Sequence, residues 1–467
     1  MNRAVLFITV LLVQQTDLDF LLQKARRAIE AGRLEEASHD LARARRLEPD
    51  SPAVHYRLAE LGEARGDLGS AVAGWRRVIE LAPDDPQAYL RLALLEAGAG
   101  RRPAALATLN RLIKRLPDEP AGYKALGQIA AESGRLEVAE KRFRELLRLS
   151  PRDAEGWSLL GAVLASQRQS DEAVAAFDKA LRYDPDLAAA HQNLGLVRVE
   201  RGELGAALRD LGTAARLAPS SAEIHCALGT VWRRLQDDSS AEKSFKEALR
   251  LRPDYPEALY GLAGLLRDTG RAVEATGLLR TYQQSNSRRH IDQQQQRRLG
   301  SLHSEVRLRL EADDLEAASA LLSRILDADA DNALAHYRQG QIAFVRGDSE
   351  RAVTLAHKAR RLNPIEPAYA NLEAAALARL GRVDEAVAAY QIVIDLSDDV
   401  DAYIASAGLL GRSQRLAEGV ALLKQGVRRQ PENRKLGSAL IAALETSGDK
   451  PAADAIRRQM GLPESGG

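Results

Sequence analysis

The sequence has little of several residue types on which other classes of protein depend. It contains one cysteine, Cys226, in 467 residues, which rules out an internal disulfide framework and a multi-cysteine metal site. Aromatic residues make up only 4% of the chain, and extensive β-structure would need more aromatic and β-branched runs than are present. Ala, Leu, Arg and Glu dominate instead, and these residues favour helix almost everywhere.

An excess of one charge is also missing, since 66 Lys and Arg stand against 65 Asp and Glu. A nucleic-acid partner usually requires a basic excess, so none is predicted. The motifs GxxxxGK[ST], GxGxxG after a strand, HExxH and GxSxG do not occur, and with them go the common signatures of phosphate cradling, zinc hydrolysis and serine hydrolysis. The sequence therefore predicts no cofactor, no metal site and no catalytic residue.

The longest apolar run lies at the N-terminus, at 4–13, after Met1-Asn2-Arg3. A basic start followed by a ten-residue apolar stretch is typical of a secretory signal, although an Ala-x-Ala cleavage site is missing. Ten residues are too few to span a bilayer as a helix, so no stable membrane span is predicted. We expect a periplasmic or secreted protein; in the alternative, a cytoplasmic one, this run caps the apolar end of the first repeat.

Two residue types recur with one period along the chain. Prolines and alanines each return every 34 residues, and a shared period and phase over eight units identify a structural repeat. The prolines are Pro49, Pro83, Pro117, Pro151, Pro185, Pro219 and Pro253, and the alanines are Ala37, Ala71, Ala105, Ala139, Ala173, Ala207, Ala241 and Ala275.

One unit, 154–187, shows what the repeat encodes. Trp157, Leu160 and Leu164 fall at helical spacing and predict the apolar face of a first helix. A polar break follows at 167–170, where most other units have a glycine that suits the left-handed end of a helix. A second helix then presents Ala173 and Phe177, until a proline stops it. Each unit is predicted to be a helical hairpin that buries its faces by stacking on its neighbours.

This order of a large residue, Leu-Gly, Ala, an aromatic, Ala and Pro at fixed offsets resembles the tetratricopeptide repeat, over nearly the whole chain. The resemblance implies an all-α, right-handed solenoid, and the phase of the repeat along the chain predicts about thirteen hairpins. The resemblance also implies a concave face, lined by the first helix of each unit, that binds protein or peptide ligands.

The repeat phase predicts the domain organisation. The expected parts are a signal or apolar segment at 1–17, eight units at 18–284, a Gln- and Arg-rich segment at 285–298, about five weaker units with a polar C-terminal cap at 299–463, and a tail at 464–467. The segment 285–298 has no apolar stripe, and we interpret it either as a linker or as an extended, solvated helix.

Histidines and carboxylate pairs are explained by the repeat. His55, His191, His225 and His336 share the slot that Trp157, Tyr89, Tyr123 and Tyr403 hold in other units, so they are predicted to be packing variants rather than metal ligands. The pairs Asp237-Asp238, Asp313-Asp314 and Asp398-Asp399 fall at hairpin turns and helix starts, where carboxylates favour the helix dipole.

Candidate ligand-binding residues are the positions of the first helices that are predicted to face the groove. They are Tyr56, Lys124, Gln128, Asn193, Arg233, Arg234, Tyr260, Arg267, Tyr337 and Phe344. Arg233, Arg234 and Arg267 are predicted to grip a carboxylate or an acidic peptide, unless Asp237, Asp238 and Asp268 neutralise them. Some family members grip chaperone C-termini with a two-carboxylate clamp, but Leu159 stands here where that clamp needs Asn.

The sequence thus predicts a non-catalytic scaffold or adaptor that binds peptide segments or a protein complex. Bacterial envelope assembly or secretion is the setting that a secretory signal would favour. The alternative is a non-catalytic regulatory or substrate-recruiting subunit of a glycan or lipid transferase system. The oligomeric state and the partner's identity are not encoded in any pattern that we recognise.

Overall fold

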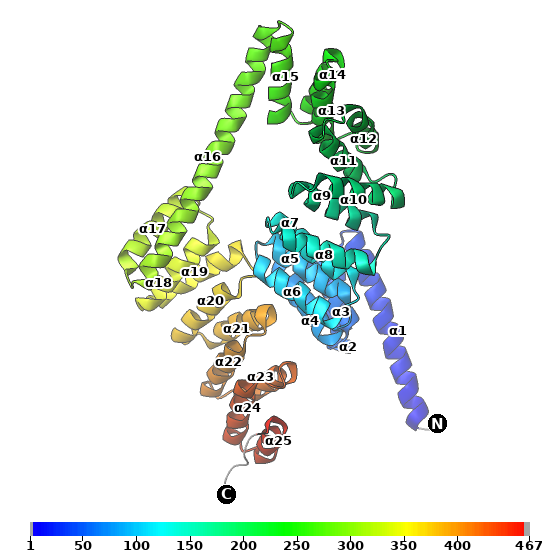
Figure 1. The fold of residues 1–467 in the computed structure, drawn as a ribbon. Coiled ribbons are helices and arrows are strands. Elements are labelled where there is room, and N and C mark those ends of the chain that lie inside the picture. The colour runs from blue at the N-terminus through cyan, green and yellow to red at the C-terminus, as the bar shows by residue number, and fades with distance from the viewer. Residues whose placement is uncertain (1–2, 462–467) are drawn as a thin grey trace. The chain divides into compact units, whose positions relative to one another are not determined.

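The computed structural model describes the backbone of residues 3–461 and the side chains of 17–287, 291 and 293–461. Over these residues the chain consists of 25 α-helices without a β-strand (Figure 1). The helices before the long α16 are α1 (Arg3–Glu30), α2 (Leu34–Leu47), α3 (Pro52–Arg65), α4 (Leu68–Leu81), α5 (Pro86–Gly98), α6 (Arg102–Arg115), α7 (Pro120–Glu132), α8 (Leu136–Leu149), α9 (Ala154–Ser166), α10 (Ser170–Tyr183), α11 (Ala188–Glu200), α12 (Leu204–Leu217), α13 (Ala222–Arg234), α14 (Asp238–Leu251) and α15 (Pro256–Asp268). From there on they are α16 (Ala272–Glu311), α17 (Leu315–Ala328), α18 (Ala333–Val345), α19 (Ser349–Leu362), α20 (Pro367–Arg379), α21 (Val383–Ser397), α22 (Val400–Arg412), α23 (Leu416–Arg429), α24 (Arg434–Thr446) and α25 (Lys450–Met460).

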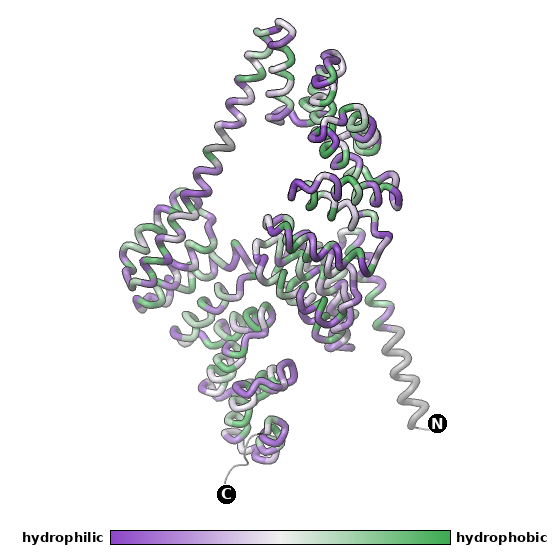
Figure 2. The backbone as a smooth tube through the Cα atoms, in the orientation of Figure 1, coloured by the Kyte–Doolittle hydropathy of each residue, from purple (hydrophilic) through white to green (hydrophobic). Residues whose placement is uncertain are grey.

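Within each of the two units described below, successive helices pair into hairpins, and neighbouring hairpins pack on one another. The predicted all-α solenoid is therefore confirmed. Hydrophobic and hydrophilic residues alternate along the hairpins, as Figure 2 shows, because each helix turns one apolar face towards its neighbours. The described helices make thirteen hairpins if α16 is shared between the eighth and the ninth.

The turns within hairpins have the backbone that the repeat predicts. Gly66, for example, has φ +70° and caps α3 in the left-handed conformation, which glycine adopts without a steric cost. Where glycine is missing, Arg168 and Gln236 take the same conformation, each with φ +63°. Asp237 then caps α14 by accepting a hydrogen bond from the Ser240 amide at 3.0 Å, so its carboxylate is a helix cap as predicted.

Close packing inside each hairpin explains the recurring small residues. The alanines with the 34-residue period are almost wholly buried, with 0–3% of their surface exposed. Phe143, Phe177 and Phe245 are buried as well, and each ring lies against a glycine of the first helix of its own unit. A small residue on one helix therefore makes room for a large one on the other.

The 40-residue helix α16 replaces the turn that should follow the eighth hairpin. Residues 285–298 lie inside it, so of the two interpretations of this segment the structure has the extended helix. The eighth unit lacks a closing proline, and the segment contains neither proline nor glycine. Nothing in its sequence therefore stops the helix.

The chain folds into two compact units. Unit 1 contains 1–108 and 299–467, and unit 2 contains 109–298. Within the described residues no helix is both long and apolar enough to cross a membrane. The side chains of the apolar run 4–13 lie outside the described residues, so the predicted secretory signal stays a prediction, and so do the domain bounds.

Candidate functional site

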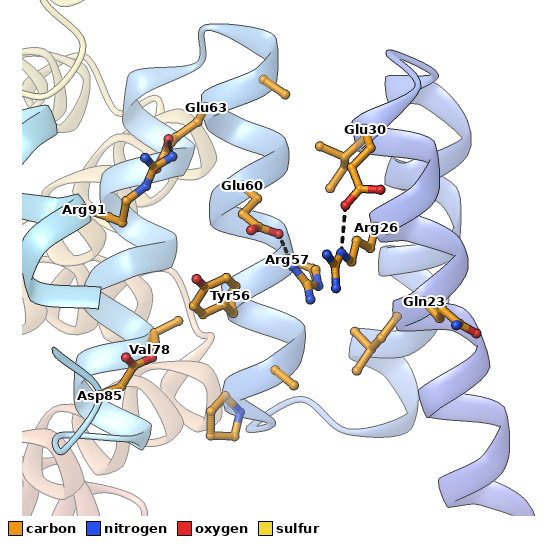
Figure 3. Close-up of a pocket in the computed structure, with 15 residues that line it drawn as sticks. Gln23, Arg26, Glu30, Tyr56, Arg57, Glu60, Glu63, Val78, Asp85 and Arg91 are labelled. Carbon is orange, nitrogen blue, oxygen red and sulfur yellow. Dashed lines mark hydrogen bonds and ion pairs between the residues drawn. The ribbon is translucent and has the colours of Figure 1, made fainter. Parts of the chain in front are cut away.

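A groove of about 1050 Å³ lies in unit 1 between the first helices of its first three hairpins (Figure 3). Helices α1, α3 and α5 supply its walls, and Val78 of α4 reaches it from behind. One side of these first helices packs on the second helices α2 and α4, so the groove is lined by residues of the other side. The groove is lined by Leu22, Gln23, Arg26, Ile29, Glu30, Pro52, Ala53, Tyr56, Arg57, Glu60, Glu63, Ala64, Val78, Asp85 and Arg91.

Three arginines, one from each of these first helices, carry the groove's positive charge. Arg26 Nε donates to Glu30 Oε1 at 2.8 Å, and Arg57 Nη1 donates to Glu60 Oε2 at 2.5 Å. Arg91 is paired with Glu63 on the neighbouring α3. Each cation is thus balanced by a carboxylate, and the groove has no strong preference for a ligand of one charge.

Tyr56 lies between these ion pairs and is the predicted residue that the groove contains. Its ring meets the Trp75 ring edge-on, with centroids 4.7 Å apart, and Trp75 Nε1 donates to Glu63 Oε1 at 2.5 Å. Burial raises the pKa of the Tyr56 phenol, so the hydroxyl stays protonated at neutral pH. Among the described residues this hydroxyl and the Gln23 amide have no hydrogen-bond partner, which leaves both able to bond a ligand.

The groove arginines were not among the predicted site residues. Arg57 and Arg91 stand 34 residues apart and hold one repeat position, which is the signal that could have found them. Arg26 belongs to the first unit, where Gln23 holds that position instead, so periodicity alone would have missed it.

Two other predicted residues of unit 1 lie in the C-terminal hairpins. The Tyr337 ring packs on the Tyr369 ring at 4.9 Å between centroids, and its hydroxyl accepts a hydrogen bond from Gln341 Nε2 at 2.9 Å. Arg379 covers the Phe344 ring at 4.3 Å from its centroid and donates to the Phe344 carbonyl at 2.7 Å. Both predicted aromatics are therefore part of contacts between successive hairpins.

The other seven predicted residues lie in unit 2. Lys124 is paired with Glu155, and Gln128 and Asn193 are half-buried on α7 and α11. Tyr260 is exposed and its ring lies 5.6 Å from the Tyr282 ring. The assignment of these residues to a binding surface stays a prediction.

The three predicted arginines of unit 2 have partners within the chain. Arg233 Nη2 donates to Asp268 Oδ2 at 2.6 Å, and Arg267 Nε lies 3.8 Å from the other oxygen of the same carboxylate. Arg234 Nη1 donates to the Val199 carbonyl at 2.7 Å. Asp268 thus partly neutralises two of the arginines, which is one of the two alternatives that the sequence left open.

The four histidines of the shared slot each bind a backbone carbonyl. His55, His191 and His225 donate from Nε2 to the carbonyls of the closing prolines six residues earlier, at 2.8–3.0 Å, and His336 donates in the same way to the Ala330 carbonyl. Tyr89, Tyr123 and Trp157 donate to the corresponding carbonyls from a hydroxyl or an indole N–H. The slot therefore selects large rings with a donor at the far end.

Cys226 is buried, and burial raises the pKa of its thiol to about 12. A thiol in that state is protonated at neutral pH and is a poor nucleophile. Within the described part of the chain, no three His, Cys, Asp or Glu side chains gather as a metal site would require.

Several solved structures are similar to part of the chain. The crystal structure of YrrB, titled a TPR protein with an unusual peptide-binding site, is 20% identical and covers 40% of this chain and 95% of its own, with a TM-score of 0.34. PilW, titled a widely conserved type IV pilus biogenesis factor, is 21% identical over 41% of this chain and 90% of its own, with a TM-score of 0.39. PilF of Pseudomonas aeruginosa is 20% identical over 55% and 97%, with a TM-score of 0.34.

Curated proteins give no match to this sequence. Two protein-family models, each described as a tetratricopeptide repeat, do match it. One matches residues 22–86, 124–188, 192–254, 303–356 and 343–401, and the other matches 63–129 and 236–294. These segments cover well over half of the sequence, and the predicted resemblance is confirmed: the chain belongs to the tetratricopeptide repeat family.

Proposed function

We propose that the protein is a non-catalytic scaffold that binds an extended polypeptide segment in the groove between α1, α3 and α5. The observation that carries the proposal is the groove itself, an open hollow that joins apolar side chains to two polar groups without partners among the described residues. An extended peptide offers backbone N–H and C=O groups at close intervals, which the Tyr56 hydroxyl and the Gln23 amide can bond. Leu22 and Ile29, which are half-buried, then contact its apolar side chains.

The charges of the groove support a ligand of mixed character. Each arginine already has a carboxylate beside it, so a strongly acidic or strongly basic ligand would leave one charge of each pair without a partner, at a cost. A peptide with both apolar and neutral polar residues avoids that cost. We further propose an envelope setting, which rests on the apolar run at 4–13; sequencing the mature N-terminus of the protein from its source cell tests it.

The binding proposal is tested with peptides selected from a random library on the purified protein. Tyr56→Phe keeps the ring contact with Trp75 and removes only the hydroxyl, so we expect about five-fold weaker binding, as for the loss of one hydrogen bond. Tyr56→Arg fills the groove and should abolish binding. Tyr183→Phe, at an exposed tyrosine of α10, is the matched control and should bind as the parent does. Equal affinities for all four proteins would refute the groove as the site.

A further inference from the structure

Two segments of unit 1 that are far apart in the sequence contact one another. Helices α4 and α21 pack together, and Arg101, in the turn between α5 and α6, donates from Nη1 to the Ile365 carbonyl at 2.6 Å. Arg101 Nε also lies 3.6 Å from Glu366 Oε2. The partners of that hydrogen bond are 264 residues apart, so the contact is not a consequence of the stacking of neighbouring hairpins.

The turn that makes this contact departs from the repeat. In seven other units the residue after the closing proline is polar and exposed, namely Asp50, Asp84, Asp118, Arg152, Asp186, Ser220 and Asp254. After Pro364 the residue is Ile365, and it is completely buried, with 0% of its surface exposed. An apolar residue at a hairpin turn would be left in water unless another surface covered it. The N-terminal segment lies against the backbone of this turn, since Arg101 donates to the Ile365 carbonyl and a Cβ atom added at Gly69, at the start of α4, would lie 3.9 Å from the Pro364 carbonyl oxygen.

The last turns of the two helices depart from the repeat as well. Most second helices carry a basic residue in the last turn, which favours the negative end of the helix dipole, but α4 and α21, like α17, have none there. Glu80 and Asp395 stand there instead, one on each side of the contact. An acid at this end of a helix is unfavourable by itself, and a nearby cation offsets that cost.

Two cations lie beside Glu80: Arg77 of the same helix, whose Nη1 is 2.7 Å from Glu80 Oε2, and Arg429, the last residue of α23. Arg429 Nε lies 3.4 Å from Glu80 Oε2 on α4, and its Nη1 lies 3.3 Å from Asp398 Oδ1 at the end of α21. Only 13% of its side chain is exposed. Arg429 thus links carboxylates of both segments in a partly dehydrated setting, where an ion pair is screened less by water than on the open surface.

We propose that the turn 364–366 and the ends of α21 and α23 form a docking surface whose partner is the N-terminal part of the same chain, α4 and the turn before α6. Ile365 is the apolar residue of this docking surface, and Arg429 and Arg101 select the N-terminal segment by their polar contacts with it. The interface is small and rich in charge, as interfaces between domains that separate and rejoin are. It lies apart from the peptide groove and does not depend on the proposed function.

Crosslinking tests the proposal in the full-length chain, with Cys226→Ser, Gly69→Cys and Pro364→Cys as the background. Pro364 tolerates replacement because Ala330 holds the same position in the preceding unit. A short bismaleimide should join the two cysteines within one chain at any dilution. Exclusive crosslinking between chains, rising with protein concentration, would overturn the proposal in favour of a contact between two copies.

Two variants in this background make the test specific. Ile365→Asp restores the polar turn that the other units have, so the hairpin keeps its fold while the docking surface loses its apolar residue. Glu80→Arg replaces the carboxylate that Arg77 and Arg429 share with a further cation. Each should slow the intramolecular crosslink at least ten-fold and leave the helical circular dichroism unchanged. Glu35→Arg makes the same charge change at a residue that is 93% exposed in the same segment, and it should crosslink as the background does. Unchanged rates in Ile365→Asp and Glu80→Arg would overturn the proposal.

Discussion

The close packing of Gly161 against Phe177 determines whether Gly161→Ala raises or lowers the free energy of unfolding. A Cβ atom added at Gly161 would lie 2.7 Å from Phe177 Cε1 and 2.8 Å from Cδ1. The Phe177 ring has no exposed surface, so it has no open space into which to move. Overpacking of this kind costs about 1–3 kcal/mol.

The same substitution also has a favourable side. Alanine is better than glycine inside a helix by about 1 kcal/mol. We therefore expect Gly161→Ala to lower the free energy of unfolding by about 1 kcal/mol, as the difference between the two effects. Gly212→Ala is the control, because Gly212 is exposed on α12 with nothing within 4 Å of an added Cβ. It should raise the free energy of unfolding by about 1 kcal/mol.

A second substitution tests whether the ring is the cause. The unit 86–119 has Ala93 and Leu109 at the two corresponding positions, and both are buried. In a Phe177→Leu background, Gly161→Ala should accordingly become neutral or stabilising, and the two changes should couple by about 1–2 kcal/mol. Urea unfolding monitored by circular dichroism gives the stability of the chain. Hydrogen exchange of the α9 and α10 amides gives the free energy of local opening. This measurement remains valid if the repeat array does not unfold in a two-state manner. A stabilising Gly161→Ala in the parent, or no coupling to Phe177→Leu, would refute the packing argument.

Two further predictions concern polar groups. Tyr123→Phe removes the hydroxyl that donates to the Pro117 carbonyl at 3.0 Å, and we expect a loss of about 1 kcal/mol in urea unfolding, whereas equal stability would mean that water replaces the bond without cost. Burial raises the pKa of Asp395 in the folded chain, so its contribution to stability is greatest below its unfolded pKa of about 4 and is lost as the pH rises through the folded pKa. Asp395→Asn should therefore have a higher Tm than the parent at a pH of about 7.5, with the difference shrinking towards a pH of about 4, and a difference that does not change with pH would contradict this reasoning.

The period of the repeat was enough to predict the hairpins, because local signals determine them. Glycine at Gly66, alanine at the first buried turn of each second helix and proline at its end act within one unit or on the next. The segment 285–298 was harder to interpret, since a polar stretch without an apolar face is compatible with a linker and with a solvated helix. Only the absence of proline and glycine favours the helix, which is what α16 is.

The candidate site was predicted less well, because side-chain pairing depends on neighbours that the repeat does not specify. Tyr56 lies in the groove as expected, but Arg234 donates to a backbone carbonyl one repeat away. Both residues stand at positions of first helices that are predicted to face the groove, so the repeat pattern does not distinguish them. What separates them is whether a hydrogen-bond acceptor of the preceding hairpin lies within reach, and that depends on the stacking of two units.

A residue that departs from the repeat is informative only if it changes the hydrogen bonding, size or burial that its repeat position normally has. Histidine in place of tyrosine or tryptophan looks like a candidate ligand, yet His191 makes the same bond to the Pro185 carbonyl that Trp157 makes to Pro151. Ile365 looks ordinary, but it breaks the chemistry of its slot, since every other residue after a closing proline is polar. A substitution that keeps the donor, the size and the burial of its slot needs no further cause. One that reverses exposure or charge does need one, and at Ile365 and Glu80 the cause that we propose is a second surface.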